Sequence, residues 1–584
     1  MRFLKRSRTG QCLSGAEGQL SRSRGPAGGA GSGECTHDGR AASRLDRRIV
    51  LQPVAKEALL AAAVATLISA ALVWLGPPGT DLAAHLYQRT LFLEHGFAVW
   101  NNFWYAGRYS FITYSVLYYP LAAVLGIGLL AVASVATAAG AFAVLAAREW
   151  GAAARSSSRT FALVWGCYVL SGAFPFVLGV ALALLALCAL QAGRRLLFVG
   201  LATLTVAASP VAFLLFCMVL AAIALERRQH DARVLQLAAA VASIGLAETL
   251  LWRAFPAGGS YPFPAANAAA ACVFCVIGFA LTWRIERARL LHHLFLIYLT
   301  ACIALFLFPF SIGENVARLR FVAVPIAVLA LSLRSWRPRP VALLALTLAI
   351  SWNLSPLAAS AAQGVDNPAA SASYWRPAIV YLKAHLSPSY RVEAVDTAGH
   401  WPAVYLARAG IPLTRGWFRQ NDFPQNKLLY APDHFGRAAY VRWLRSLGVR
   451  YVVASRAPPD YSARAESRLV RNDESSLRIV LRNRNLDIFE VRSPRPIIVG
   501  PDDPEVLKLG ASSLVLHLNR AGDYRIALRY SPYWTPSEGC VSPSPDGMVR
   551  LHAPRPGLVT LRFVVTTERA LATVAGVATP VCAD

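Results

Sequence analysis

The chain has 584 residues, of which 55% are hydrophobic and only 15% are charged. Soluble domains carry nearer a quarter charged residues, so the composition excludes an ordinary soluble protein. The net charge is +26, but the basic residues are spread through short loops between apolar runs, where they set membrane topology. We therefore expect a polytopic membrane protein with a soluble remainder and no nucleic-acid partner.

The N-terminal region divides into a polar stretch and a first apolar run. Residues 1–46 are rich in Gly, Ser and Arg and almost free of apolar residues, which predicts a disordered cytoplasmic segment. Residues 54–75 are apolar, follow Arg47 and Arg48, and are not followed by a small-residue cleavage site. They predict an uncleaved transmembrane helix that starts in the cytoplasm.

Ten further apolar runs predict ten more spans, and eleven spans place the C-terminus outside. The arginine-rich loops between them then fall on the cytoplasmic side. Several runs are shorter than the roughly 20 residues that a bilayer requires, so hairpins that do not cross fully are an alternative for 160–192 and 196–226. The ten runs lie near 121–147, 160–172, 174–192, 196–209, 210–226, 234–253, 266–283, 290–310, 320–334 and 339–354.

The composition changes after residue 354, where polar residues and alternating patterns appear. We expect a transmembrane domain over 47–354 with an outer loop at 76–120, then an extracytoplasmic α/β domain over 355–494. Short strand signals separated by turns predict a β-sandwich over 495–584. Cys540 and Cys582 lie in this outer part, where a disulfide between them is expected.

The outer loop begins with "GTDLAAHLYQRTLFLEHG", residues 79–96. On a helix, Asp81, His85, Gln88 and Arg89 share one face, which predicts an amphipathic helix on the outer membrane surface. Asp81 is then either paired with His85 or Arg89, or is a carboxylate that takes a proton from a sugar hydroxyl or holds a metal ion. Its place just after the first span favours a functional role.

Two other outer segments carry candidate substrate contacts. The aromatic run 100–121 contains Asn101, Asn102 and Arg108, and is either an interfacial belt or a sugar-binding surface. The loop 309–325 gathers a cluster that is either an internal ion pair or a phosphate site built on arginine. That cluster is Glu314, Asn315, Arg318 and Arg320.

A fourth segment, residues 399–430, is polar and aromatic with little apolar periodicity. It contains His400, Arg419 and Asp422. Such a run is typical of a functional surface, although sealing the outer domain onto the membrane domain is an equal alternative.

These features resemble the GT-C superfamily of integral membrane glycosyltransferases, and within it large envelope proteins of actinobacteria. The matching positions are Asp81 after the first span, the aromatic loop 100–121, and the segments 171–187, 207–216, 313–320 and 414–430. The resemblance implies a polyprenyl-phosphate sugar donor and transfer outside the cytoplasm. Many members have paired acids in the first loop, whereas Leu82 follows Asp81 here, so a divalent metal ion stays open.

We therefore predict a plasma-membrane glycosyltransferase that moves a sugar to an envelope polysaccharide or glycolipid. By the resemblance, Asp81 is the catalytic carboxylate and Arg318 and Arg320 contact the donor phosphate, with His85 orienting Asp81. A transporter of lipid-linked precursors and a non-catalytic scaffold are the alternatives. The remaining predicted substrate contacts are Arg89, Asn101, Asn102, Arg108, Glu314, Asn315, His400, Arg419 and Asp422.

Overall fold

A computed structural model describes residues 39–227, 232–308, 310–431, 435–472, 475–577 and 582. Most of the segment expected to be disordered, 1–46, lies outside the described residues. The first helix, α1 (Gly39–Leu75), begins within that segment, before the predicted start at residue 54. Ala, Arg and Leu favour helix, and they extend α1 toward the N-terminus.

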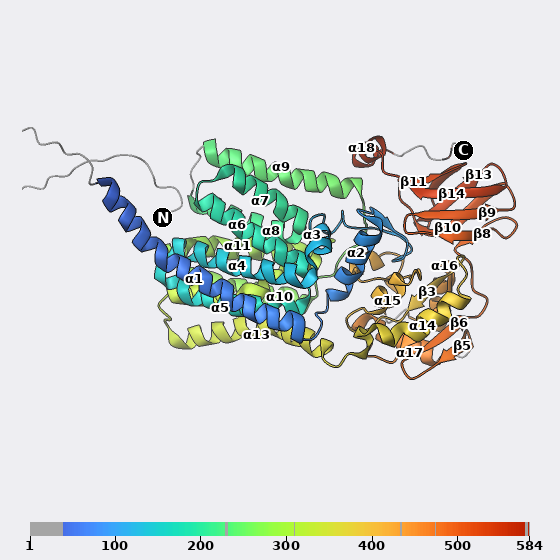
Figure 1. The fold of residues 1–584 in the computed structure, drawn as a ribbon, viewed down its shortest axis with the longest axis horizontal. Helices are drawn as coiled ribbons and strands as arrows, with labels where there is room; N and C mark the ends of the chain where they lie inside the picture. Colours follow the sequence, from blue (N-terminus) through green and yellow to red (C-terminus); the bar gives the residue numbers. More distant parts are fainter. Residues whose placement is uncertain are drawn as a thin grey trace, which may run out of the picture.

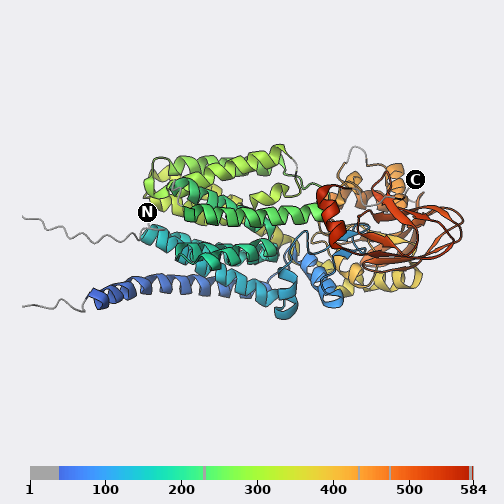
Figure 2. The same ribbon diagram turned by 90° about the horizontal axis from the view of Figure 1, so that it is seen from above.

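A bundle of antiparallel helices forms one end of the molecule, and the outer domains form the other (Figure 1, Figure 2). Each expected apolar run has a corresponding helix. These are α1, α4 (Ile127–Trp150), α5 (Arg155–Cys167), α6 (Phe174–Gln191), α7 (Arg195–Ala208), α8 (Pro210–Arg227), α9 (Ala232–Ala254), α10 (Ala265–Thr282), α11 (Arg289–Leu307), α12 (Ala323–Leu333) and α13 (Arg339–Gly364).

The chain is a multi-pass membrane protein by the length and composition of its helices. Among the described residues, eight segments are long and apolar enough to cross a membrane. One of them, Ile127–Ser171, contains both α4 and α5, while α7 and most of α8 are shorter apolar helices. The number of complete crossings therefore stays a prediction.

The first three long helices alternate in direction. Arg159, near the start of α5, pairs with Glu57 in the first half of α1 at 3.0 Å. Gly128, at the start of α4, packs against Val73 near the end of α1. The chain therefore runs along α1, back along α4 and along α5 again in the direction of α1.

The structure divides the segment predicted as one span over 121–147. Gly126 has φ of +79°, a conformation that favours glycine. It separates the short helix α3 (Tyr118–Leu125) from α4.

The predicted surface helix is α2 (Leu82–His95), but it does not lie free on the membrane surface. It packs against α3 and against α15 (Pro402–Arg408) of the α/β domain. His85 and Gln88 on its polar face are buried, whereas Leu93 and Phe97 are exposed. The polar side is therefore buried, because α3 and the start of α6 pack against it.

The α/β domain contains a four-stranded sheet in the order β3-β4-β6-β5, covered by helices. The strands β3 and β4 are parallel and the other pairs are antiparallel. The strands are β3 (Arg391–Ala394), β4 (Val449–Ser455), β5 (Leu477–Arg482) and β6 (Leu486–Val491), and the helices are α14 (Ala372–His385), α15, α16 (Arg437–Ser446) and α17 (Arg464–Asn472).

Two four-stranded sheets with one shared apolar core follow, in the orders β12-β13-β10-β7 and β11-β14-β9-β8. Side chains alternate between this core and the surface, as in β13. The strands are β7 (Ile498–Val499), β8 (Glu505–Leu509), β9 (Ser513–Leu518), β10 (Gly522–Arg529), β11 (Trp534–Pro536), β12 (Cys540–Pro543), β13 (Met548–Ala553) and β14 (Gly557–Phe563).

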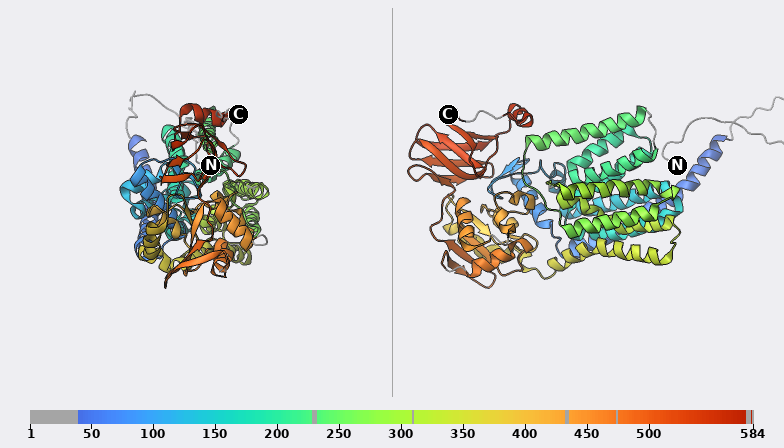
Figure 3. Two further views of the ribbon diagram at one scale, coloured as in Figure 1. Left: turned by 90° about the vertical axis from the view of Figure 1, so that its right-hand side faces the viewer. Right: turned by 180° about the vertical axis from the view of Figure 1, so that it is seen from behind.

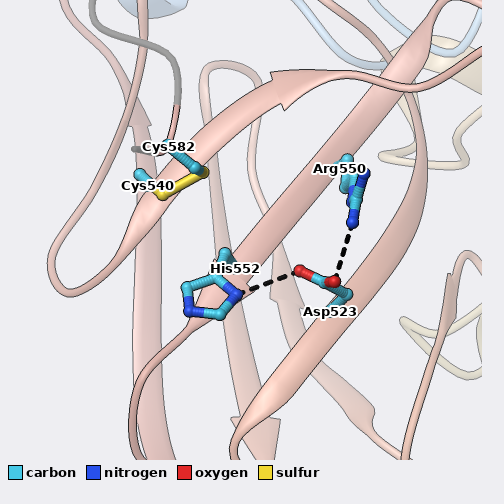
Figure 4. The surroundings of a disulfide bond; sticks show 5 residues. All are labelled: Asp523, Cys540, Arg550, His552 and Cys582. Atoms are coloured by element: carbon cyan, nitrogen blue, oxygen red, sulfur yellow. Dashed lines mark hydrogen bonds and ion pairs between the residues drawn. A yellow bond between two sulfur atoms is a disulfide. The ribbon is translucent and has the colours of Figure 1, made fainter. Parts of the chain in front are cut away.

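The C-terminal segment returns to the sandwich. The helix α18 (Thr567–Ala575) follows β14 and contacts α9. Cys540 in β12 forms a disulfide with Cys582, beside the ion pairs that Asp523 makes with Arg550 and His552 (Figure 4).

Candidate functional site

Asp81 is held at the start of α2 by the turn that follows α5. Its backbone N–H donates to the carbonyl of Ser171 at 3.0 Å. Gly172 has φ of +72°, and a Cβ there would lie 2.7 Å from the backbone nitrogen of Leu82. The two segments approach so closely that only glycine fits, and this contact fixes where Asp81 points.

Arg318 meets Asp81 from a segment more than 200 residues downstream. It lies in the 3-10 helix Gly313–Val322, and its guanidinium is 3.8 Å from Asp81 Oδ2. Its Nε donates to Asn315 Oδ1 at 3.1 Å, and its Cζ lies 5.2 Å from the centre of the Phe176 ring. Both charged side chains keep about a fifth of their surface exposed, 20% for Asp81 and 17% for Arg318, so each is available to a ligand.

A polar cavity of about 280 Å³ contains this pair. Glu314 and Arg320 form a second ion pair at its wall, at 3.4 Å, and Asn267 donates to Glu314 at 2.8 Å. The lining residues include Thr80, Asp81, Tyr168, Ser171, Tyr261, Glu314, Asn315, Arg318, Arg320, Ser360 and Gln363.

Arg318 also lines two further cavities. One of about 340 Å³ lies on the side of the outer domains, and its wall includes Tyr114, Trp252 and Asn421. The other, of about 210 Å³, lies between α4, α6, α8 and α11 and is almost wholly apolar. One guanidinium therefore stands where an almost wholly apolar space meets a polar cavity and a cavity of mixed lining.

The electrostatic surroundings of Asp81 extend into the α/β domain. Burial raises the pKa of Asp81, while the positive charges of Arg318, His400 and Arg419 oppose that rise, and the net shift is upward. A carboxylate with a raised pKa in a positively charged pocket is suited to accept a proton and release it again.

His400 reaches this region from the outer domain with unusual backbone geometry. Its φ is +57°, and its Nδ1 lies 2.6 Å from Asp396 Oδ2. Burial lowers the pKa of His400, but the carboxylates of Asp396 and Asp460 raise it more, so the net shift is upward. Arg419 donates to Asp460 at 2.8 Å. The two outer-domain cations predicted from the sequence thus lie near Asp81, each paired with an acid.

His85 does not have the expected contact with Asp81. It is fully buried among the rings of Tyr114, Tyr118 and Phe174, and its Nδ1 lies 3.2 Å from the Tyr119 hydroxyl. Burial lowers its pKa to about 3. Among the described residues no hydrogen bond or ion pair joins it to Asp81, so the geometry favours a neutral core histidine over an orienting one.

Several predicted substrate contacts are used inside the protein instead. Arg89 donates to the carbonyl of Ala122 at the end of α3. Asn101 accepts from the backbone of Phe103, Asn102 donates to the carbonyl of Gly510, and Arg108 donates to Asn421. Asp422 is buried against Arg415, Asn426 and Tyr430. Asn102 and Arg108 join the first outer loop to the other domains, and the other three bond within their own part of the chain. None of the five lines the polar cavity around Asp81.

The donor set does not fit the divalent metal ion that the sequence left open. The two acids of the polar cavity, Asp81 and Glu314, each face a guanidinium. Divalent metal ions favour sites where carboxylate or carbonyl oxygens are in excess. In the described part of the chain no group of three or more His, Cys, Asp or Glu side chains is placed to hold a metal.

The sequence did not single out Asp396, Asp460 or Phe176, which support the site. One signal was present, because Asp396 ends the predicted strand 391–396 and lies four residues before His400. Side chains at the ends of strands next to loops often face functional sites. Asp460 and Phe176 were not singled out, since their roles depend on contacts with Arg419 and Arg318, which lie far away along the chain.

Comparisons with known proteins give a structural likeness but no family. No protein-family model matches the chain, and no curated protein matches it. The structure is similar to the crystal structure of an oligosaccharyltransferase from Archaeoglobus fulgidus, which was determined in complex with Zn and sulfate. The identity is 14%, the match covers 68% of each chain, and the TM-score is 0.30.

Proposed function

We propose that the chain is a membrane glycosyltransferase that uses a sugar carried on polyprenyl phosphate and transfers it to an envelope glycan or glycolipid outside the cytoplasm. The observation that carries this proposal is the position of Arg318 between an apolar cavity, a polar one and a third of mixed lining. Such a junction suits an amphiphile with an anionic head, because the tail takes the apolar space and the phosphate takes the guanidinium.

The proposed reaction uses the ion pair of Asp81 and Arg318, whose charged atoms lie 3.8 Å apart. An acceptor hydroxyl attacks the anomeric carbon of the donor sugar, and the bond from that carbon to the phosphate oxygen breaks. The hydroxyl proton passes to the carboxylate of Asp81. Polyprenyl phosphate leaves with the bonding electrons, and Arg318 stabilises the charge that develops on it.

Ligand binding breaks an internal ion pair. Arg318 and Asp81 neutralise each other in the free protein. A phosphate that takes the guanidinium releases the carboxylate to act as a base, so donor binding prepares Asp81 for the acceptor. His400 and Arg419 belong to the outer domain and lie near Asp81. They would contact the acceptor or the sugar.

The first test is transfer from labelled polyprenyl-phosphate sugars in membranes that contain the chain. Asp81→Asn should lower transfer by about 10²–10⁴-fold, the range for loss of a general base, and should leave donor binding intact. Arg318→Gln should weaken donor binding and lower transfer by about 10²-fold or more. Matched controls are Asp366→Asn and Arg376→Gln, which change exposed residues away from the cavities.

The outcomes separate the candidate functions. Full transfer by Asp81→Asn would contradict the role of the carboxylate. Movement of the intact carrier across the membrane without transfer to any acceptor would favour a transporter, and neither activity would favour a scaffold.

The rate should also depend on pH in a defined direction. Asp81 must be deprotonated to accept a proton, and its pKa is raised above the ordinary value of 3.8. The acid limb of the transfer rate should therefore titrate above pH 3.8, and Asp81→Glu should move this limb while Arg376→Gln should not. An acid limb that is unchanged in Asp81→Glu would assign the titration to another group.

A further inference from the structure

The C-terminal helix α18 leaves the sandwich and returns to the membrane domain. It lies beside the outer end of α9 (Figure 1, Figure 3). The inner side of α18 packs against this end of α9, since Ala570 and Val574 join the apolar cluster that contains Ala254 and Phe255. The hydroxyl of Tyr533 donates to the carbonyl of Ala254 at 2.6 Å. The end of α9 is thus a fixed attachment point for the sandwich.

The position of α9 determines what surrounds α18. No residue in the most apolar 18-residue stretch of Val234–Ala254 is buried within the protein. One side of α9 packs on α7, so lipid covers the rest of its surface. Trp252 and Arg253 lie in its last turn, and these residue types gather at the level of the lipid headgroups. Because α18 packs on that same turn, it lies at the headgroup level too.

The outer side of α18 and its flanks are apolar and exposed. Leu571 is 65% exposed and Val577 is 62% exposed, and Val564 and Val565 precede the helix with 40% and 39% exposed. The helix is also firmly held, because Thr566 caps its N-terminus, Arg569 donates to Thr535 and Cys582 returns the chain to Cys540. A rigid apolar patch at headgroup level is the arrangement of an interfacial helix.

We infer that α18 is a membrane anchor that seats the sandwich on the outer leaflet, with Val564, Val565, Leu571 and Val577 in contact with lipid. The occupant is lipid and not a protein partner, because the patch continues the lipid-covered surface of α9. This inference is independent of the proposed transfer reaction, since it concerns how the outer domains are held.

The test places a fluorescent amino acid at single positions of the full chain in nanodiscs. The lipid is phosphatidylcholine that carries a doxyl quencher at carbon 5 of one acyl chain. A probe at 571 should lose about half of its emission relative to unlabelled lipid, since an interfacial helix reaches about 5–10 Å into the headgroup and acyl boundary. A probe at 577 should respond in the same direction.

Leu558 supplies the matched control. It is also a leucine and is 64% exposed, but it lies at the far end of β14 from α18. A probe at 558 should not be quenched. Equal quenching at 571 and 558, or no quenching at either 571 or 577, would overturn the inference and would leave the patch as a surface for another partner.

Discussion

Asp81 and His85 lie four residues apart on one helix, yet their surroundings differ completely. Asp81 faces Arg318 in a polar cavity, whereas His85 is surrounded by aromatic rings. Helical periodicity placed both residues on one face of the expected helix. It could not separate the two roles, because the rings around His85 come from other segments. The sequence does not predict that these segments pack against this helix.

Glu393 is a buried acid that the proposed reaction does not use. Burial raises its pKa well above the ordinary value of 4.5, and the neighbouring Glu466 raises it further. Glu466 is the better stabilised of the two as an anion, because the Tyr440 hydroxyl donates to it at 2.8 Å and Arg415 lies 3.8 Å away. Glu393 therefore carries the proton in the folded protein.

This protonation predicts how stability changes with pH. The folded pKa is raised, so the unfolded chain loses its proton first and the wild type loses stability as pH rises above about 4.5. Glu393→Gln cannot lose a proton. The difference in Tm, Glu393→Gln minus wild type, should therefore increase between pH 4 and pH 8, at about 1.4 kcal/mol of stability per pH unit for one proton.

The measurement is thermal unfolding of the purified full chain, followed by tryptophan fluorescence at several pH values. Glu505→Gln is the control, because Glu505 is exposed on β8, and its Tm difference should stay flat. A flat difference for Glu393→Gln as well would show that Glu393 is ionised in the folded state.

At the scale of elements, the turn between α5 and α6 determines the position of α2. A Cβ at Gly172 would lie 2.7 Å from Leu82 N and 3.0 Å from Asp81 N. Gly172→Ala should therefore displace the start of α2 and with it Asp81, lowering transfer at least about tenfold, because small displacements of a catalytic group reduce rates strongly.

Gly193 provides a close control for that substitution. Its φ is also +72°, but a Cβ there meets nothing within 4 Å. Gly193→Ala should cost only the left-handed strain of about 1–2 kcal/mol and leave transfer unchanged. Equal transfer by the two variants, measured at equal protein level, would mean that the turn does not position Asp81.

The elements themselves were predicted unevenly. Apolar runs predicted the bundle helices because hydrophobic length is a local property. The surface helix over 79–96 was placed correctly along the chain, but its polar face is buried, since α3 and the start of α6 pack against it. The division of the predicted span at Gly126 depends on a positive φ. A glycine within an apolar run does not predict such a conformation.

For the whole molecule, the first outer loop joins the membrane domain to both outer domains. Trp104 is fully buried and donates from Nε1 to the carbonyl of Ala403 at 2.9 Å. Arg529 of the sandwich donates to the carbonyl of Tyr105 at 3.0 Å. The junction between the domains is therefore assembled by contacts between segments about 300 and 420 residues apart, which no local pattern in one sequence reveals.

Trp104→Ala should loosen this junction specifically. Removing a buried tryptophan costs about 3–5 kcal/mol, and here the loss falls on the contact between domains. Hydrogen exchange of α2 and α15 should become faster, while β4 in the centre of its sheet should keep its protection. Trp283→Ala, at a half-exposed tryptophan, is the control. Hydrogen exchange that becomes faster in all three elements, or that does not change in any of them, would contradict a junction that can be loosened on its own.

The central claim is that Arg318 binds the phosphate of a polyprenyl carrier beside Asp81. A density map of the full chain in nanodiscs with a polyprenyl phosphate present tests it most directly. We expect phosphate density within hydrogen-bond reach of Arg318, about 2.7–3.2 Å, with the hydrocarbon entering the apolar cavity beside Phe176. Phosphate density at another place, with Arg318 still paired to Asp81, would contradict it.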